Sequence, residues 1–346
     1  MIDRIQSLDH LRGLMAVLIM FYHYFSWIYG GFDSSSFWGR IGIYGVSIFY
    51  VLSGLTLFIV YREKLFEKGI LNYIKRRILR IHPLLILITI ATVVLLRNYE
   101  LYYTKTRAIN TLALNLTGLF GFFESKRYIA TGAWSIGNEL VFYSFFPLIM
   151  WFRKINTNLT YLCFLITVLV GCYFAFYLFD PNQSLSNNWH FYVNPFNQIF
   201  LFAGGIAIGE LMIEKKKNNR LFIVVLTLST FAFILLPVTG DRVNLTSGTN
   251  RIIFSFLSIL IVLSTFKINY NLGSFFNSMF DVLGKTSYTI YLLHPIIYYS
   301  LKKYEILPDN SYSQLAICVL TTVTLSIFIY KFYERPFISM FRDKRN

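Results

Sequence analysis

Charged residues are scarce in this chain of 346 residues: Asp, Glu, Lys and Arg make up only 14%, whereas hydrophobic residues make up 55%. Soluble domains usually carry about 25% charged residues. A soluble domain of this length could not bury so much apolar surface. The composition therefore excludes an ordinary soluble protein and predicts one embedded in a membrane.

Acidic residues are rarer still, 17 against 32 Lys and Arg, and the formal net charge is +15. The basic residues lie between apolar runs rather than in a separate basic domain, so we expect no nucleic-acid partner. Cysteine is also sparse. Cys163, Cys172 and Cys318 fall inside apolar runs, with neither disulfide nor metal spacing. We expect them to be packing residues, and we expect no metal site.

A cleavage site of small residues is missing after the apolar stretch at the N-terminus, which contains Arg12 and His23. A retained first span is therefore favoured over a secretory signal. The sequence also lacks an internal repeat and a separate soluble region. We expect a single membrane-embedded domain over residues 1–346.

Apolar runs of about 20 residues, long enough to cross a bilayer, are present instead. Ten are good candidates: 8–29, 41–61, 80–96, 134–152, 159–179, 196–213, 220–238, 250–267, 284–302 and 312–333. An eleventh run, 108–123, is shorter and contains Asn110 and Asn115.

The distribution of Lys and Arg indicates whether the eleventh run crosses, because these residues accumulate on the cytoplasmic side. If it does not cross and the N-terminus is cytoplasmic, 22 of the 32 Lys and Arg lie inside. If it crossed, the basic clusters around Arg77 and Lys216 would lie on opposite sides. The sequence therefore predicts an all-α membrane protein with about ten transmembrane helices and both termini cytoplasmic. The segment near 108–123 is expected to be re-entrant or to lie at the outer surface.

Arg12 and His23 are ionisable residues inside the first span, where such residues cost about 2.5–3.5 kcal/mol and are functional candidates. They lie eleven positions apart, which places both on one helical face, about 16 Å apart along the axis. Asp9, one turn before Arg12, is positioned to neutralise it. Alternatively, Arg12 reaches the inner headgroups and His23 hydrogen-bonds within the bundle.

Glu139 lies near the outer start of the fourth span, at a depth similar to that of His23 in this topology. A carboxylate beside an imidazole fixes its tautomer and supports its action as a general base, so we predict that Glu139 orients His23. The alternative is two unrelated polar groups at the interface. His294 lies in mid-span before Pro295, where the sequence is equally compatible with a structural role and a substrate contact.

Arg77 and Arg80 precede the third span and are three residues apart, so they share one helical face. Two guanidinium groups on one face can bind phosphates bidentately. Ordinary positive-inside charge explains the same spacing equally well.

Six short motifs follow one another in the order of a known family. They are Asp9-x-x-Arg12-Gly13 with His23, 49–54, 76–83, the Trp134-Ser135…Glu139…Phe142-Tyr143…Pro147 segment, 284–295 and 333–337. The chain resembles the acyltransferase-3 family of integral membrane acyltransferases, which includes bacterial O-acetyltransferases of surface polysaccharides. It departs from the family pattern at His82, where an aromatic residue is commoner, and at Gly137-Asn138.

This resemblance implies a ten-span fold in the bacterial inner membrane and an acyl-CoA donor taken from the cytoplasm. It implies an acceptor acylated in the membrane or at its outer side, a requirement for Arg12 and His23, and donor binding by Arg77 and Arg80. Many relatives carry an appended extracytoplasmic domain, and we expect none here.

We therefore expect transfer of an acyl group, preferably acetyl, from acyl-CoA to a hydroxyl of a cell-surface carbohydrate, such as an O-antigen or capsule sugar, or of its lipid-linked precursor. Arg12, Arg77 and Arg80 would bind the donor. His23, oriented by Glu139, would deprotonate the acceptor, with transfer either direct or through an acyl-histidine. Candidate supporting residues are Asp9, Ser53, Trp134, Ser135, Tyr143 and His294.

The expected partners are acyl-CoA, a carbohydrate acceptor and membrane lipids, and the sequence leaves the oligomeric state open. The alternative function is a transporter or flippase for a glycan or lipid intermediate, because polar residues in spans also build transport paths. Transporters typically show paired broken helices or internal symmetry, and the sequence shows neither.

Overall fold

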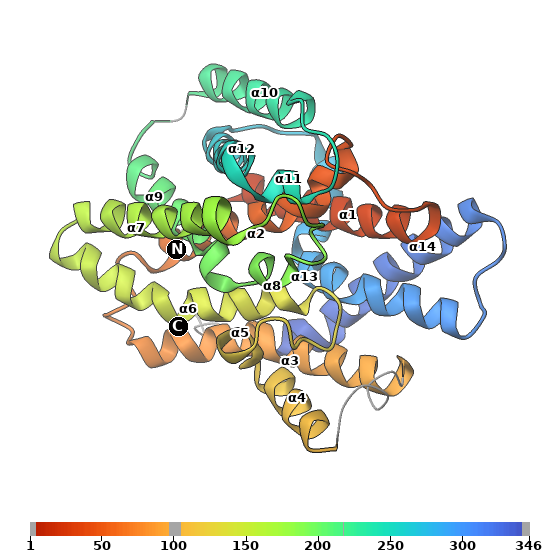
Figure 1. Ribbon diagram of the computed structural model, residues 1–346. Helices are drawn as coiled ribbons and strands as arrows, with labels where there is room; N and C mark the ends of the chain where they lie inside the picture. Colours follow the sequence, from red (N-terminus) through yellow and green to blue (C-terminus); the bar gives the residue numbers. More distant parts are fainter. Residues whose placement is uncertain (1–4, 97–104, 217, 341–346) are drawn as a thin grey trace.

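The protein is a bundle of long helices, seen in a computed structural model that describes residues 5–96, 105–216 and 218–340 (Figure 1). Within these ranges there is no β-strand. The long helices are α1 (Gln6–Tyr29), α2 (Phe37–Tyr61), α3 (Ile70–Leu96), α6 (Ala133–Ile155), α7 (Asn158–Tyr173), α9 (Pro195–Met212), α10 (Asn219–Leu235), α12 (Gly248–Lys267), α13 (Ser274–Lys303) and α14 (Ser311–Ile329). The shorter elements are α4 (Lys105–Thr117), α5 (Phe120–Phe123), α8 (Trp189–Tyr192), α11 (Val243–Thr246), α15 (Arg335–Ser339) and the π-helical η2 (Phe174–Leu178) and η3 (Tyr330–Glu334).

Each of the ten predicted spans coincides with one of the long helices. In the described part of the chain, seven helical segments are long and apolar enough to cross a membrane. They contain α1, α2, α3, α7, α9, α12 and α14. Helix α10 is apolar but has 17 residues, whereas α6 and α13 are long but more polar. The chain is an all-α, multi-pass membrane protein, while the count of ten spans and the cytoplasmic termini stay predictions.

The segment 108–123 forms α4 and α5, separated at Gly118. The 13 residues of α4 rise about 20 Å, less than the hydrocarbon core of about 30 Å, so α4 alone cannot cross. Asn115 ties α4 to the connection that follows α5, because its amide donates to Arg127 O at 2.8 Å and accepts from Ile129 N at 2.8 Å. This geometry agrees with the prediction that the segment does not cross.

Helices α1 and α13 pack backbone against backbone at two facing glycines. A Cβ atom added to Gly13 would lie 2.7 Å from Gly284 N, and one added to Gly284 would lie 2.5 Å from Asp9 O. Only glycine permits this approach. The contact brings Asp9 and Arg12 of α1 close to α13 at Gly284.

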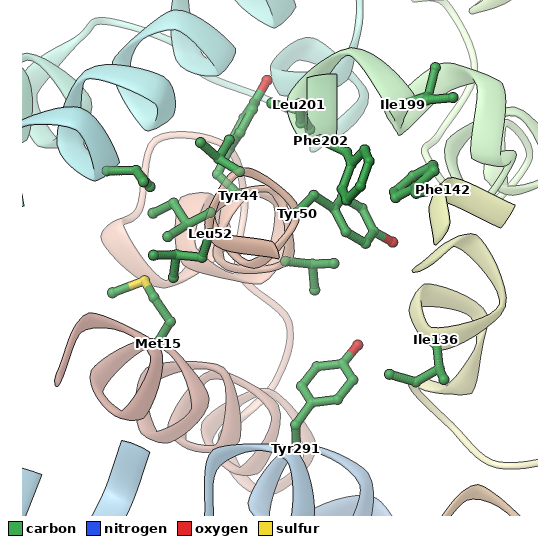
Figure 2. Packing of buried hydrophobic residues seen from close by; sticks show 14 of the residues in the cluster. Met15, Tyr44, Tyr50, Leu52, Ile136, Phe142, Ile199, Leu201, Phe202 and Tyr291 are labelled. Carbon is green, nitrogen blue, oxygen red and sulfur yellow. The ribbon is translucent and has the colours of Figure 1, made fainter. Parts of the chain in front are cut away.

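Helix α2 packs on α9, α1 and α12 in the middle of the bundle. The Tyr50 ring meets Phe142 of α6 at 5.0 Å, and Phe142 meets Phe202 of α9 at 5.5 Å, both between centroids. Figure 2 shows these three rings side by side. This aromatic core fixes the azimuth of α2 and α6, whose polar residues Ser53 and Glu139 then face each other.

Two buried arginines that the sequence analysis did not single out support this frame. Arg40 donates to the carbonyl oxygens of Phe233 at 2.8 Å and Leu236 at 2.5 Å, at the C-terminal end of α10, where carbonyls lack helical partners. Arg251 is fully buried and donates to Gln198 Oε1 at 2.7 Å. Arg40 thus fastens α10 to α2, and Arg251 fastens α12 to α9.

Candidate active site

The site residues lie toward two ends of the bundle, which we name after them. The arginine end carries Arg12, Arg77 and Arg80, and the histidine end carries His23 and His294. Helices α1, α3 and α13 run from the arginine end to the histidine end, and α2 and α6 run the opposite way (Figure 1).

A cavity of about 410 Å³ lies among α1, α2, α3, α6 and α13 and begins at the arginine end. Eight of the eleven sequence-predicted site residues line it, namely Asp9, Arg12, Ser53, Arg77, Arg80, Ser135, Glu139 and Tyr143. The volume is within the range of small-molecule sites. The fold therefore gathers residues from four distant segments into one site.

The charged side chains of this cavity are mostly basic. Arg12 Nη1 donates to Asp9 Oδ1 at 2.9 Å, which confirms that Asp9 neutralises Arg12. Arg77 lies over the Tyr143 ring, 5.8 Å from its centroid. Among the described residues Arg80 has no hydrogen-bond or ion-pair partner, so its donors remain available to a ligand.

The charge balance of the lining is positive. Lys285 of α13 adds a fourth basic residue, against two acidic ones, Asp9 and Glu139. A positive, partly enclosed cavity concentrates anions. It is suited to phosphate groups, which guanidinium forks bind bidentately.

Glu139 belongs to a hydrogen-bonded network inside the cavity. Ser53 Oγ donates to Glu139 Oε1 at 2.6 Å, and Tyr143 OH donates to the same oxygen. The two hydroxyl oxygens are 3.1 Å apart. The carboxylate is thus held by α2 and by its own helix, with its charge delocalised over two donors.

His23 and His294 form a hydrogen-bonded pair across α1 and α13. His294 Nε2 lies 3.1 Å from His23 Nδ1, and the ring centroids are 5.0 Å apart. Each Nδ1 also lies 3.0 Å from a carbonyl oxygen one turn earlier, Ile19 O and Ile290 O. A carbonyl only accepts, so in a neutral pair each ring carries its proton on Nδ1, and the His23 Nδ1–H is shared between Ile19 O and His294 Nε2. That arrangement leaves His23 Nε2 unprotonated, as a general base requires.

The expected pairing of His23 with Glu139 was wrong, because His294 is the partner of His23 and the Glu139 carboxylate bonds Ser53 and Tyr143. Similar depth in the membrane does not make His23 and Glu139 neighbours. Both residues lie about 9 Å from the ends of their helices at the histidine end, so their depths are similar. Depth does not fix azimuth, and Glu139 faces α2 rather than α1.

Tyr291 lies between the cavity and the histidine pair. It lines the cavity, and its ring centroid is 6.1 Å from that of His294. Its hydroxyl accepts from Ser135 Oγ at 2.9 Å and donates to Gly132 O at 3.2 Å. Figure 2 shows this side chain extending from α13 toward Ile136 of α6. Tyr291 therefore forms a wall between the two parts of the site.

Trp134, a predicted supporting residue, lies outside the cavity. Its ring meets Trp189 at 5.8 Å and Tyr192 at 5.3 Å, and it is buried. These contacts anchor the start of α6 to the α8 region. The structure thus gives Trp134 a packing position rather than a ligand-facing one.

Cavity residues on α13 and a buried carboxylate beyond α14 were not predicted from the sequence. Tyr288 and Tyr291 line the cavity and precede His294 at spacings of three, a helical-face pattern that could have revealed them. Glu334 is 1% exposed and accepts from Thr289 Oγ1 at 2.7 Å. The predicted last span ended at residue 333, so the sequence placed this carboxylate beyond the span. The π-helical turn η3 carries it inward, where the charge of Arg80 acts on it.

An all-helical membrane bundle with a basic internal cavity and a buried histidine pair defines an integral membrane protein with a polar site among its spans. A family model described as an acyltransferase domain matches residues 5–331. The chain therefore belongs to this family, the acyltransferase-3 family that its motifs resemble. Membership of the family makes it a membrane acyltransferase.

Curated relatives include proteins of Staphylococcus aureus strains MSSA476, MRSA252 and MW2, each named probable poly-beta-1,6-N-acetyl-D-glucosamine export protein. Each is 28% identical over 229 residues, which cover 61% of this chain and 64% of the relative. The match therefore spans less than two thirds of those relatives. No solved structure matches the chain.

Proposed function

We propose that the protein transfers an acetyl group from acetyl-CoA to a hydroxyl of a cell-surface carbohydrate or its lipid-linked precursor, in the bacterial inner membrane. The proposal rests on one observation: a histidine pair and a basic cavity lie on either side of Tyr291. Family membership supplies acyl transfer. The carbohydrate acceptor is supported by the relatives, whose name refers to a polysaccharide of N-acetylglucosamine.

Donor binding belongs to the cavity. Arg80 has unshared donors, and Arg77 is held over Tyr143, so both can engage the phosphates of CoA. The narrow pantetheine arm would occupy the cavity between α1 and α2. Because Asp9 already neutralises Arg12, we assign Arg12 a secondary part in donor binding.

The chemistry belongs to His23. Its free Nε2 takes the proton of the acceptor hydroxyl while that oxygen attacks the thioester carbonyl. The carbon–sulfur bond then breaks, and the CoA thiolate leaves and is protonated. General-base help of this kind contributes about 10²- to 10⁴-fold in rate. Ile19 O and His294 Nε2 both accept from His23 Nδ1–H and so keep the proton away from Nε2.

The acyl group must pass Tyr291 to reach His23. Its hydroxyl is held by Ser135 and Gly132 O, and loss of these two bonds would let the ring turn aside. Two neutral hydrogen bonds form a modest barrier, because each contributes about 0.5–1.5 kcal/mol net. Tyr291 would thereby keep water and thioester apart until the donor is seated.

The network around Glu139 supports the donor half. Its carboxylate orients the Ser53 and Tyr143 hydroxyls, which we propose to position the thioester end of the donor. This role replaces the orientation of His23 that the sequence analysis assigned to Glu139.

The proposal is tested by mass spectrometry of surface glycans from cells that carry the wild-type gene, no gene, or His23→Ala. We expect one acyl group per modified sugar to disappear in the last two strains, with the amount of inserted protein unchanged in the variant. Wild-type acylation by His23→Ala would refute the assigned chemistry.

Export of a polysaccharide is the second candidate, because the relatives are named as export proteins. The same strains separate the two functions. Loss of export would leave the glycan inside the cell, whereas loss of acyl transfer would leave the glycan at the surface with a lower mass.

A further inference from the structure

Arg242 is a cation at the histidine end that none of the steps above employs. It precedes α11 in the connection from α10, and its Nη1 donates to Tyr22 OH. The Tyr22 ring stands edge-on to the His23 ring, with centroids 4.8 Å apart. One aromatic ring therefore separates the guanidinium from the general base.

The position of Tyr22 is fixed from the side of α2. A Cβ atom added to Gly42 would lie 2.3 Å from the Tyr22 ring, so the ring is seated directly on the glycine backbone. A buried ring in such close contact has one position available. Tyr22 is thus a rigid support for Arg242.

The backbone around Arg242 is fixed by two other connections at the same end. Ser34, between α1 and α2, donates through both N and Oγ to Gly240 O at 2.9 Å. Asp241 Oδ1 accepts from Leu185 N, in the connection before α8, and from Val243 N, each at 2.8 Å. Three connections therefore interlock beside His23 and hold Arg242 in place.

The guanidinium of Arg242 is half-buried and lacks an anionic partner. Among the residues that the structure describes, no carboxylate pairs with it. Its neighbour Asp241 is engaged by backbone amides. Holding a cation beside a base without neutralising it is costly in a partly apolar site unless a ligand supplies the counter-charge.

Trp27, one turn further along α1, also contacts the base. Its ring centroid lies 5.1 Å from His23, 6.1 Å from His294 and 5.0 Å from Tyr298. Tyr24 and Tyr299 also contact the Trp27 ring, with centroids 6.1 Å and 5.0 Å away, so the part of this half-buried ring that stays exposed is what can meet the C–H groups of a sugar ring. Trp27 and Tyr22 thus both contact His23, and Arg242 lies beyond Tyr22.

We propose that Arg242, Tyr22 and Trp27 form the acceptor subsite, and that it takes a sugar bearing an anionic oxygen group close to the acylated hydroxyl. The shared chemistry is a carboxylate of the sugar itself or a phosphate that joins the sugar to a lipid carrier. Arg242 binds the anion, Trp27 packs on the ring, and the hydroxyl is thereby presented to His23. This inference rests on the proposed function.

The experiment uses the full chain in lipid nanodiscs with labelled acetyl-CoA and three acceptor probes. These are methyl N-acetylglucosaminide, which is neutral, methyl glucuronide, which carries a carboxylate, and polyprenyl-diphosphate-linked N-acetylglucosamine. The variants are Arg242→Gln, Arg242→Lys and the matched control Lys126→Gln, which removes an exposed charge in the connection before α6.

We expect the wild-type protein to favour one anionic probe over the neutral one, and the preferred probe identifies the source of the charge. Arg242→Gln should raise KM for that probe about 10- to 100-fold, as expected for lost charge-assisted hydrogen bonds. The neutral-probe KM and the acetyl-CoA affinity should stay within about twofold of wild type, where the preserved donor affinity also reports folding. Arg242→Lys should recover part of the loss, and Lys126→Gln should match wild type.

Equal use of neutral and anionic probes by the wild-type protein would overturn the inference, as would an equal loss on both in Arg242→Gln. If the wild-type protein binds acetyl-CoA but acetylates none of the probes, the acceptor subsite is refuted while donor binding stands. If it binds no acetyl-CoA, the proposed function itself fails.

Discussion

The cavity at the arginine end and the histidine pair differ in how their polar groups are satisfied. In the cavity, Arg80 keeps free donors and basic residues outnumber acidic ones. In the histidine pair, hydrogen bonds to each other and to backbone carbonyls hold both rings, and aromatic rings surround them. Unsatisfied positive charge suits the cavity to binding an anionic ligand. A fixed tautomer suits the histidine pair to proton transfer. Tyr291 lies at the boundary between them.

The division teaches that donor binding and chemistry can be damaged separately. Substitutions in the cavity should alter donor affinity, and substitutions in the histidine pair should alter the rate at saturating donor. Four predictions follow this division, beginning with the largest effect.

Replacement of His23 by Ala should lower the acetyl-transfer rate about 10²- to 10⁴-fold, because the general base is lost. The rate is measured with labelled acetyl-CoA at saturating donor in nanodiscs, with His10→Ala, the other histidine of α1, as the matched control. A loss below tenfold in His23→Ala would show that another group removes the proton.

Replacement of His294 should separate orientation from packing. His294→Ala removes one of the two acceptors of the His23 Nδ1 proton and leaves Ile19 O, and we expect the transfer rate to fall about 10- to 100-fold, as for one hydrogen bond to the charged imidazolium formed during transfer. His294→Gln retains an oxygen that can accept this bond, so its transfer rate should be at least tenfold higher than that of His294→Ala. Equal rates for the two variants would mean that His294 only fills space.

Replacement of Arg80 by Gln should weaken acetyl-CoA binding about 10- to 100-fold, while the rate at saturating donor changes little. Arg76→Gln is the matched control, because Arg76 lies on the same helix but outside the cavity. Isothermal titration of acetyl-CoA into nanodiscs gives both affinities. An equal loss in both variants would indicate general surface charge rather than phosphate contacts.

Replacement of Tyr291 by Phe should have the smallest effect, because it removes only the hydroxyl bonds to Ser135 and Gly132. Hydrolysis of acetyl-CoA without acceptor should rise about 2- to 10-fold, the range expected for a net loss of one neutral hydrogen bond, because Ser135 Oγ still donates to Gly132 O in the variant. Tyr288→Phe, which removes a hydroxyl bonded to Ile81 O on the cavity wall, should leave hydrolysis unchanged. Unchanged hydrolysis in Tyr291→Phe would refute the barrier.

The helices were predictable from the sequence because each is set by a local apolar run, and every predicted span matches a long helix. The convergence of Arg12, Arg77 and Arg80 was also predictable, since the family resemblance implies that all three bind one donor. The pairing of His23 was not. His23 meets His294 because α1 packs on α13, and Glu139 faces α2 instead because remote contacts such as that of Phe142 with Phe202 fix the azimuth of α6.

Residues contributed by short irregular elements were also beyond prediction. Glu334 turns inward through a π-helical turn, and Arg242 is positioned by hydrogen bonds among three connections. Neither feature leaves an apolar period in the sequence. Tyr288 and Tyr291 were partly predictable. Their spacing before His294 indicates a shared helical face, but only the structure shows that this face of α13 lines the cavity.

The separation of donor binding from chemistry is tested most directly by the acetyl-CoA dissociation constant of His23→Ala in nanodiscs. If the cavity alone binds the donor, Kd should stay within about twofold of wild type although transfer is lost, because distant sites act independently. A rise in Kd of about tenfold or more would contradict this account, since it would place His23 within the donor site.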